Sequence, residues 1–484
     1  MAIQLNGKRI LLWDTDILEE YQGISIRSHK PSRKNVALRC DDMWEGRTCG
    51  YPTVMKYGDE YRLYYRASGL GSISSTSGDE CFCLATSRDG KVFEKKPLHI
   101  YESGGSYENN IIHMEERFVD NFSIHYDDNP DCPENEKFKA LSMVFIREPE
   151  VKTLLAYYTS PDGIHFTYQR ILDVKGVFDS HNVLLYDNKN KLYRLYLRDF
   201  HHRDGSDVFY VPDDAVMKPC IRDVRLSTSQ DLITWSAPVK LNYGDEDLIQ
   251  MYTSQIIKYP RADVYFGIPT RYKDRCDDLA GIKYLSNEGG WRTEMLKEGN
   301  RVATSMTDCV IMYSHDGINF RRDTNAFLSP TYEENSGWIY GDCYCSHGLV
   351  ETVSDENPNV TELSFYTGIG YRTKNVSFVR FTVRLDGFYS LRADYSGGEL
   401  LTRRMTVGDT LRINFSTSAL GGVRIVICDE YANPIEGFDS GVLFGNSTDR
   451  NVDFAKPLST LRGKSVRLKI YMNDADIYSV CSDI

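Results

Sequence analysis

Three acidic residues lie just before or at the start of strand-like stretches: Glu45 in MWEGRTCGYP, Asp120 in FVDNF and Asp179 in FDSHNV. Two carboxyl groups that face one bond can cleave a glycosidic linkage, because one protonates the leaving oxygen while the other acts as nucleophile or as base toward water. Acids that share a pocket repel one another, so such an arrangement is costly unless it is used. We therefore take these three as candidate catalytic residues. For each, a turn or cap role is the alternative.

Other polar and aromatic side chains occupy neighbouring positions where a substrate could be held. We expect the arginines to bind substrate or to pair with the acids. The histidine would contact substrate or bond within its turn, and the aromatic rings would stack on a sugar or belong to the core. The candidate substrate-binding residues are Trp44, Arg66, Asn121, His181, Asn182, Arg198, Asp199, Tyr252, Gln255, Arg271 and Asp342. Similar positions are held by Asp41, Asp42, Glu246, Asp247 and His347.

A short phrase recurs through the chain and divides it into units. TSPDGIHF (159–166) returns as YSHDGINF (313–320), and further copies surround Asp89, Asp231 and, in degenerate form, Asp386. Neighbouring copies lie 69 to 85 residues apart. Asp-Gly followed by an aromatic residue is typical of a hairpin turn, because glycine accepts positive φ and the aromatic ring begins the next strand. The phrase therefore predicts a turn between the outer strands of a repeated unit.

Each of these turns is preceded by a strand-like run in which aromatic and aliphatic residues alternate with basic ones. The runs are EYRLYYR (60–66), FKALSMVF (138–145), LYRLYLR (192–198), VYFGIPTR (264–271) and LSFYTGIG (363–370). Units of about 70 residues with roughly four strands each are typical of propeller blades. We therefore predict an all-β protein with a five-bladed β-propeller over residues 1–388.

The remaining residues, 389–484, change in character. Short strands such as TLRINFSTS, GVRIVICD and SVRLKIYM alternate with Gly, Asn and Asp turns, which predicts an antiparallel β-sandwich. No Pro- or Ser-rich tether separates the two parts, so we expect the sandwich to pack rigidly against the propeller. Binding of carbohydrate is the alternative role for this part.

A propeller would bring the candidate residues together. The first strand of each blade lines the central axis and the second runs back antiparallel to it. The start of the first strand and the end of the second therefore open on the same face. Acids from three successive blades would converge there on one axial pocket.

Composition narrows the class of partner. The formal charge of −12 and the sequence pI near 5.4 argue against a nucleic-acid or anionic-membrane surface and favour a neutral, polyol-like substrate. The chain has no apolar stretch of about 18 residues, and its start lacks the features of a secretory signal. We expect a cytoplasmic protein, with a removed signal left open.

Twelve cysteines are scattered without paired C-x-x-C spacings, which predicts free buried thiols. The two C-x-C pairs, Cys81/Cys83 and Cys343/Cys345, leave a metal pair as the alternative. We otherwise expect neither metal nor cofactor. Formation of homo-oligomers stays open.

The five repeats, the axial acids and the trailing sandwich resemble the five-bladed propeller glycoside hydrolases, the superfamily that includes invertase-like β-fructosidases and arabinofuranosidases. The resemblance implies a nucleophile or base at Glu45, a stabilising aspartate at Asp120, where invertases carry Arg-Asp-Pro, and a general acid at Asp179, where invertases carry Glu-Cys. The chain lacks the Asn-Asp-Pro-Asn-Gly motif of invertases. Its phrases FDSHNVLLYD and LDGFYSLRADYSGGELLT are instead similar to uncharacterised relatives in the group.

The predicted activity is hydrolysis of a glycoside, most simply a furanoside such as a fructoside or arabinofuranoside, by carboxylates in the axial pocket. Two alternatives keep the same fold. The chain also resembles the mannoside phosphorylases, which share phrases like SHDGINF, and Arg66, Arg198 and Arg271 around one mouth would suit phosphate. A propeller that only binds carbohydrate is the second alternative.

Overall fold

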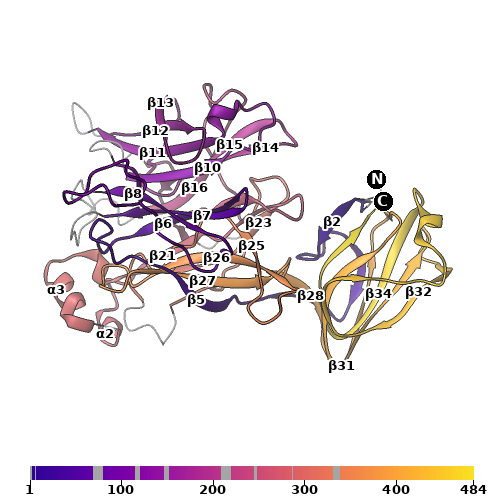
Figure 1. Ribbon diagram of the computed structural model, residues 1–484. Coiled ribbons are helices and arrows are strands. Elements are labelled where there is room, and N and C mark those ends of the chain that lie inside the picture. The colour runs from indigo at the N-terminus through magenta and orange to yellow at the C-terminus, as the bar shows by residue number, and fades with distance from the viewer. Residues whose placement is uncertain are drawn as a thin grey trace.

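The computed structural model describes residues 3–5, 7–68, 80–114, 120–146, 152–208, 220–244, 248–285, 287–330 and 338–483. Of Asp120, Lys152 and Glu288 it describes the backbone only. Strands dominate this part of the chain, in agreement with the all-β prediction (Figure 1). No helix within the described ranges is both long and apolar enough to cross a membrane.

Three antiparallel four-stranded sheets follow one another along the chain, each with its strands in sequence order. The first contains β6 (Gly50–Tyr57), β7 (Glu60–Ala67), β8 (Cys81–Ser87) and β9 (Ile111–His113). The second contains β10 (Asp120–Tyr126), β11 (Phe138–Ile146), β12 (Lys152–Ser160) and β13 (Thr167–Leu172). The third contains β14 (Val183–Asp187), β15 (Leu192–His201), β16 (Ile221–Ser229) and β17 (Val239–Lys240).

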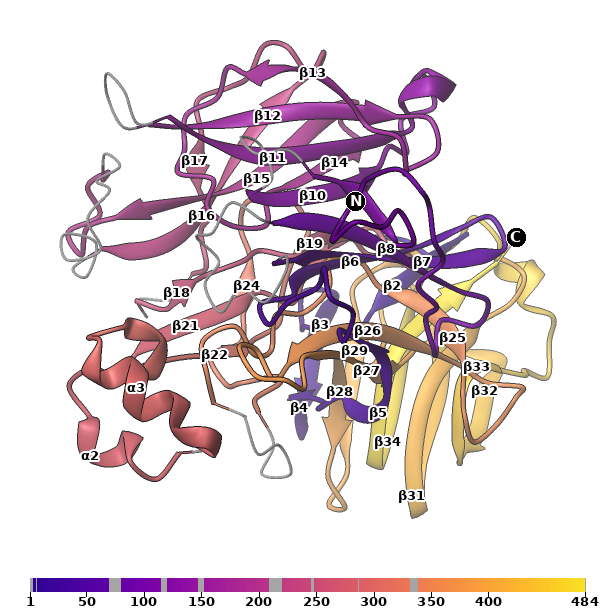
Figure 2. The ribbon, with the colours of Figure 1, turned by 60° about the vertical axis from the view of Figure 1, so that its left-hand side comes forward.

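The fourth repeat is divided into two smaller sheets. One contains β19 (Ile256–Lys258), β20 (Tyr265–Gly267), β23 (Met312–Ser314) and β24 (Arg321–Arg322), and the other contains β18 (Gln250–Met251), β21 (Thr270–Asp274) and β22 (Ser305–Cys309). Between β21 and β22 the chain inserts α2 (Leu279–Ile282) and α3 (Trp291–Lys297), with single 3₁₀ turns at Glu288–Gly290 and Arg301–Ala303. Figure 2 shows these helices beside β21 and β22. These helices were not predicted from the sequence.

The sheet of the fifth repeat joins the two ends of the repeat region. Its strands are β25 (Val350–Val353), β26 (Thr361–Ile369), β27 (Ser377–Arg384) and, on the outer edge, β5 (Ser32–Arg39). The first strands of successive sheets contact one another, β6 with β10, β10 with β14, β14 with β19, and β25 with β6. A parallel bridge between Thr53 and His347 connects the first and fifth sheets. Because β5 comes from the start of the chain, it ties the last sheet to the first.

The recurring phrase forms the predicted turns. In the second sheet, Asp162 lies between β12 and β13, and its Oδ1 accepts hydrogen bonds from the backbone N–H groups of Ile164 (2.8 Å) and His165 (2.9 Å). Asp316 and Asp231 accept the same pair of bonds in their own turns. The glycine of the phrase has positive φ, as at Gly163 (74°). This bonding pattern explains why the chain repeats the phrase.

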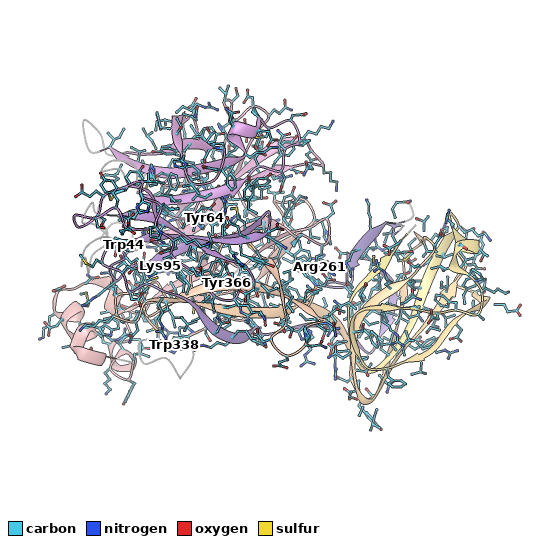
Figure 3. All side chains as sticks on the ribbon, viewed as in Figure 1. Trp44, Tyr64, Lys95, Arg261, Trp338 and Tyr366 are labelled. Atoms are coloured by element: carbon cyan, nitrogen blue, oxygen red, sulfur yellow. The ribbon has the colours of Figure 1, made fainter. Side chains whose placement is uncertain are left out.

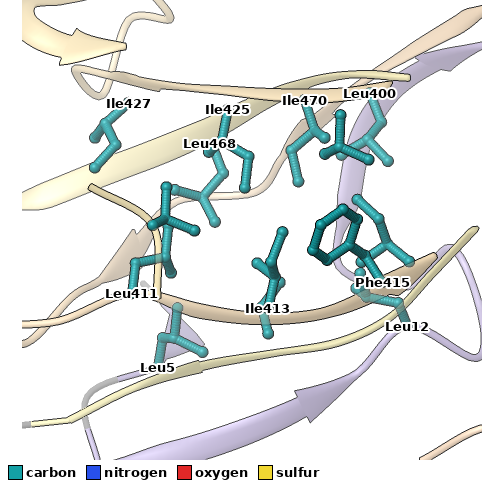
Figure 4. Packing of buried hydrophobic residues seen from close by; sticks show 14 of the residues in the cluster. Leu5, Leu12, Leu400, Leu411, Ile413, Phe415, Ile425, Ile427, Leu468 and Ile470 are labelled. Carbon is teal, nitrogen blue, oxygen red and sulfur yellow. The ribbon is translucent and has the colours of Figure 1, made fainter. Parts of the chain in front are cut away.

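The other strands surround a separate apolar core, formed by Leu5, Leu12, Leu411, Ile413, Phe415, Ile425, Leu468 and Ile470 among others (Figure 4). They form one hydrogen-bonded sheet. Its C-terminal strands are β28 (Tyr389–Ala393), β29 (Gly398–Thr402), β30 (Met405–Thr406), β31 (Arg412–Cys428), β32 (Pro434–Leu443), β33 (Asn446–Asn451) and β34 (Ser465–Ser482). Figure 1 shows this unit beside the repeat region, with β28 at the junction.

The start of the chain belongs to this second unit, which corrects the predicted boundary of 1–388. Its four short strands are β1 (Ile3–Gln4), β2 (Lys8–Leu11), β3 (Leu18–Gln22) and β4 (Ile24–Ser28). β2 pairs with β34, β3 with β29 and β4 with β28. The repeat region therefore begins at β5. Short amphipathic strands show no preference for one sheet over another, so the open edges of β28 and β29 decided the pairing.

One buried aspartate joins the two units. Asp386, in the degenerate fifth copy of the phrase, accepts hydrogen bonds from Arg261 Nε (2.8 Å), Arg9 Nη1 (3.1 Å), Tyr259 OH (3.0 Å) and Ser479 Oγ (2.7 Å). The indole of Trp13 donates to the carbonyl oxygen of Asp386 (2.8 Å). The junction between the units is thus held by hydrogen bonds that converge on Asp386.

We predict that Asp386→Ala lowers the free energy of unfolding by about 3–5 kcal/mol, because Arg9 and Arg261 would remain near the interface without their carboxylate. Denaturant titration followed by tryptophan fluorescence measures the effect. Asp394→Ala is the matched control: that side chain is 84% exposed and lies 3.6 Å from Arg392, so a change within about 1 kcal/mol is expected. Equal effects of the two substitutions would show that Asp386 does not hold the junction.

Candidate active site

The first predicted acid, Glu45, is buried and fully engaged. Its carboxylate accepts hydrogen bonds from Tyr65 OH (2.6 Å), the Asp42 N–H (2.8 Å) and Lys95 Nζ (3.0 Å). Lys95 Nζ also lies 3.0 Å from Asp41 Oδ1 and 2.7 Å from Asp42 Oδ2. Burial raises the pKa of Glu45, against the opposing charge of Lys95. Glu45 is therefore part of a closed ion-pair cluster.

Trp44 belongs to the same region of the first sheet, as the positions of Trp44 and Lys95 in Figure 3 show. Its indole Nε1 donates to Asn110 Oδ1 (2.9 Å), and its ring packs against the core that contains Cys40 and Cys49. These contacts fit the core role that was the alternative to sugar stacking.

Asp179 lies in a different cluster, built from the first three sheets. Asn121 Nδ2 donates to Asp179 Oδ1 (3.3 Å), and Arg66 Nη1 donates to Asn121 Oδ1 (3.3 Å). Arg198 Nη1 donates to the backbone carbonyl of Asp179. Asn121 has φ 59° at an irregularity in the pairing of β10 with β11, a conformation that re-aims a side chain. The described contacts thus bring four predicted residues together and leave Glu45 in its own cluster.

Arg66, at the end of β7, is the centre of this cluster. Its Nη2 donates to Tyr371 OH (3.1 Å) and to the Thr48 carbonyl (3.3 Å). The guanidinium carbon lies 4.7 Å from the ring centroid of Tyr51. The side chain is 5% exposed. Its position is therefore fixed by hydrogen bonds and by stacking on an aromatic face.

The structure adds a carboxylate that the sequence analysis missed. Glu80 directly precedes β8 and is buried, and its Oε1 lies 3.7 Å from Arg66 Nη1. Burial raises the pKa of Glu80, with Arg66 opposing and Asp179 adding to the shift. A usable signal existed in the strand-like run CFCLATS (81–87), which precedes the turn at Asp89: Glu80 stands at its start, and an antiparallel third strand starts at the edge where the second ends, as the pairing of Ala67 with Cys81 shows.

Tyrosines and arginines form a wall next to Asp179. The Arg198 guanidinium carbon lies 4.8 Å from the ring centroid of Tyr252, whose hydroxyl shares a short hydrogen bond with Tyr340 OH. Arg222, also missed, lies 4.1 Å from the Tyr272 ring centroid. Burial and the nearby charge of Arg198 lower the pKa of Arg222. Such a wall suits a hydroxyl-rich or anionic ligand.

Two predicted residues, Asp342 and Asn182, hold members of this cluster in position. The buried Asp342 accepts a hydrogen bond from the Tyr371 N–H (3.0 Å), which places the tyrosine that bonds Arg66. Asn182 donates to the Phe178 carbonyl (2.8 Å), and its Oδ1 accepts from the Arg198 N–H (3.2 Å). Both side chains position their neighbours through contacts with the backbone.

His181 and Gln255 lie between the sheets, in the packed centre. His181 Nδ1 bonds Gln255 Oε1 (3.1 Å), and Gln255 Nε2 donates to the Cys345 carbonyl (2.6 Å). The His181 ring centroid lies 6.0 Å from that of His347. Burial lowers the pKa of His181 to about 3 and that of His347 to about 4. These rings are neutral at physiological pH and serve the packing here.

The remaining predicted residues have other partners. Arg271 forms a two-pronged ion pair with Asp308 (2.7 and 2.6 Å). Asp199 lies 3.3 Å from Arg225, and burial raises the pKa of Asp199 to about 6. The side chain of Asp120 and the residues Glu246 and Asp247 lie outside the described residues.

Two groups in the described ranges have the spacing of a metal site, Asp41/Asp42/Glu45 and Asp14/Asp16/His315. Each already contains a cationic side chain, Lys95 in the first and Arg321 in the second, which lies 2.9 Å from Asp14 and 2.7 Å from Asp16.

All twelve cysteines are free thiols, and all but Cys276 are buried, as predicted. The Sγ atoms of Cys81 and Cys83 lie 4.0 Å apart, and neither residue belongs to the two groups whose side chains have the spacing of metal ligands.

A groove of about 300 Å³ opens where the two units meet, lined by His29, Lys30, Glu362, Arg384 and Tyr478 among others. Arg384 is engaged there by Asn414 Oδ1 (2.6 Å) and the Phe415 carbonyl (3.0 Å). None of the candidate catalytic or substrate-binding residues lines this groove. It belongs to the junction between the units.

No family model and no curated protein matches the chain. Among solved structures, an N-acetylgalactosamine deacetylase from F. plautii, in complex with blood group B trisaccharide, is similar at 12% identity and a TM-score of 0.44, covering 93% of this chain and 96% of that one. A glycosyl hydrolase from Bacteroides ovatus is 16% identical with a TM-score of 0.39, covering 73% and 93%.

A third structure comes from work stating that the GH130 family of mannoside phosphorylases contains glycoside hydrolases that target β-1,2-mannosidic linkages in Candida mannan. It is 14% identical with a TM-score of 0.41, covering 73% of this chain and 94% of that one. These likenesses are too distant to assign a family.

We predict that Lys95→Met destabilises the protein by about 3–5 kcal/mol at pH 8, because three carboxylates would lose their cation, and by less at pH 5. The raised pKa of Glu45 means that the folded state binds more protons than the unfolded chain, so stability falls as the pH rises through that pKa. Removal of Lys95 raises this pKa further. Thermal unfolding at both pH values measures the effect. The exposed Lys96→Met is the control, and a loss independent of pH would contradict the account.

Proposed function

We propose that the protein is a glycoside hydrolase whose site is the Arg66–Asn121–Asp179 cluster. In this proposal the five repeats, the fourth of which is divided into two sheets, are the blades of a five-bladed β-propeller closed by β5, and the second unit is a β-sandwich. One observation carries the proposal: a half-buried aspartate and a buried glutamate from different sheets both face Arg66 and its hydrogen-bond partner, beside a wall of tyrosines.

The chemistry follows from that geometry. Two carboxyl groups can divide the roles of acid and of base or nucleophile in glycosidic cleavage. Asn121, Arg66 and the tyrosine hydroxyls supply donors and acceptors for sugar hydroxyls. Asp120 remains a proposed stabilising residue, since its backbone directly precedes Asn121. Glu45 supports the first sheet in this account, and a furanoside remains the proposed substrate class.

The phosphorylase alternative also has a specific observation in its favour. Arg198 and Arg222 influence each other electrostatically, and both lie against the Tyr252 ring, at 4.8 and 5.7 Å from its centroid. Arg301 lies 5.4 Å from the Tyr340 ring centroid. Three guanidinium groups around one aromatic wall could receive a phosphate oxyanion as the attacking group in place of water.

We predict turnover without phosphate. A screen of aryl furanosides and pyranosides, with and without inorganic phosphate, measures release of the aryl alcohol. NMR of the first-formed sugar shows retention or inversion. A reaction that needs phosphate and yields a sugar phosphate would establish the phosphorylase in place of the hydrolase.

We predict that Asp179→Asn lowers kcat/KM on the substrate from that screen by about 10²–10⁴-fold, because an amide can neither accept nor donate the proton that the step requires. The exposed Asp173→Asn, a few residues earlier in the chain, is the control and should stay near wild type. A carbohydrate-binding protein without catalysis would show sugar affinity in calorimetry and no turnover in any of the three proteins.

A further inference from the structure

Glu80 is a buried acid, and its carboxyl group lacks part of the hydrogen bonding that a buried carboxylate needs. Its side chain is 8% exposed, and among the described residues its Oε1 has no hydrogen-bond partner. The ionised form of a carboxyl group is costly to bury without hydrogen bonds. A group kept in this state needs either a proton or a ligand that the site receives.

The neighbours of Glu80 are themselves held in place. Arg66 is fixed by Tyr371, Thr48 and the Tyr51 ring, and it leads through Asn121 to Asp179. Glu80 and Asp179 therefore approach the Arg66–Asn121 pair from different sheets, one from the start of β8 and the other from the segment before β14. The titratable groups that face Glu80 are Arg66, Asp179 and Tyr371.

A purely structural role for Glu80 would be to neutralise Arg66. Glu80 Oε1 lies 3.7 Å from Arg66 Nη1, within ion-pair distance but beyond hydrogen-bond length, so the two charges attract without a hydrogen bond between these atoms. Arg66 instead makes its hydrogen bonds to Tyr371, Thr48 and Asn121. The hydrogen bonds described for the arginine come from groups other than Glu80, so Glu80 Oε1 keeps its hydrogen-bonding capacity for a substrate atom.

We propose that Glu80 is the proton donor of the reaction and that Asp179 is its partner base or nucleophile. This inference rests on the proposed glycosidase function and replaces Asp179 with Glu80 in the role of acid. As the bond from the anomeric carbon to the leaving oxygen breaks, Glu80 gives its proton to that oxygen. Where Asp179 acts as base, water adds to the anomeric carbon and gives a proton to Asp179, and proton exchange with solvent then restores both carboxyl groups. Where Asp179 acts as nucleophile, it forms an ester with the anomeric carbon; water then displaces the Asp179 carboxylate and gives its proton to the Glu80 carboxylate, which restores both groups.

The leaving group of the substrate tests this role. With the sugar identified by the screen, Glu80→Gln should lower kcat/KM by about 10²–10⁴-fold on the phenyl glycoside. It should lower it less than about tenfold on the 2,4-dinitrophenyl glycoside, whose leaving group departs without protonation. The control is Glu94→Gln, an exposed residue that follows β8, and it should match wild type on both.

The outcomes separate the two claims. Equal losses on both glycosides would overturn the role of Glu80 while leaving the glycosidase function intact. The same leaving-group dependence found in Asp179→Asn in place of Glu80→Gln would return the role of acid to Asp179. A wild-type protein that cleaves none of the glycosides would overturn the function itself.

A second measurement needs no substrate. Burial raises the pKa of Glu80, so the folded state binds a proton that the unfolded chain releases, and wild-type stability falls as the pH rises through the raised pKa. Glutamine has no such titration. The Tm of Glu80→Gln relative to wild type should therefore become more favourable between pH 4.5 and pH 7.5. A difference that stays constant with pH would show that Glu80 holds no extra proton, and would overturn its role as donor.

Discussion

The arrangement of the candidate site depends on how one buried cation is accommodated. Arg66 is charged at every physiological pH, and its side chain is almost inaccessible to water, so the protein must supply acceptors and aromatic faces from all around it. Those groups come from four separate segments: Thr48 and Tyr51 before and at the start of the first sheet, Asn121 in the second, Glu80 at β8, and Tyr371 after β26. Meeting the needs of one guanidinium therefore aligns segments that are more than 300 residues apart in the chain.

The same constraint recurs at the other junctions of the molecule. Lys95 gathers Asp41, Asp42 and Glu45 at the first sheet, and Asp386 gathers Arg9 and Arg261 where the two units meet. Buried ion pairs contribute little net stability, but leaving one partner alone is expensive. Networks of this kind therefore favour one register of packing over its alternatives. In this protein they lie where sheets or units meet, which is where a wrong register would do most harm.

Much of this structure could be predicted from the sequence because local chemistry determines it. The Ser and Asp side chains of the Ser-x-Asp-Gly phrase accept hydrogen bonds from backbone N–H groups a few residues away, so the phrase predicts a turn wherever it occurs. The alternating runs before the phrase form strands, as predicted. Asn121, Arg66, Arg198 and Tyr252 could be predicted to lie on one edge because strand direction decides which edge of a sheet a residue occupies. The pairing of the four N-terminal strands with the C-terminal unit was not predicted, because contacts between residues far apart in the chain leave no pattern in the local sequence. The helices inserted between β21 and β22 were not predicted either, because they are too short to show a helical period.

Glu45 and Glu80 show where positional reasoning stops. Both lie at the edge of the first sheet that faces the candidate site, but an edge has two faces, and the position along a strand does not decide between them. In the turn after Glu45, the Thr48 carbonyl accepts a hydrogen bond from Arg66. The Glu45 carboxylate instead accepts one from Tyr65, and neighbouring residues of β7 such as Tyr65 and Arg66 point to opposite faces of the sheet. Glu80 lies next to Cys81, which pairs with Ala67, and its carboxylate falls on the Arg66 side. Which acid becomes available for chemistry was thus decided by the alternation of Tyr65 and Arg66.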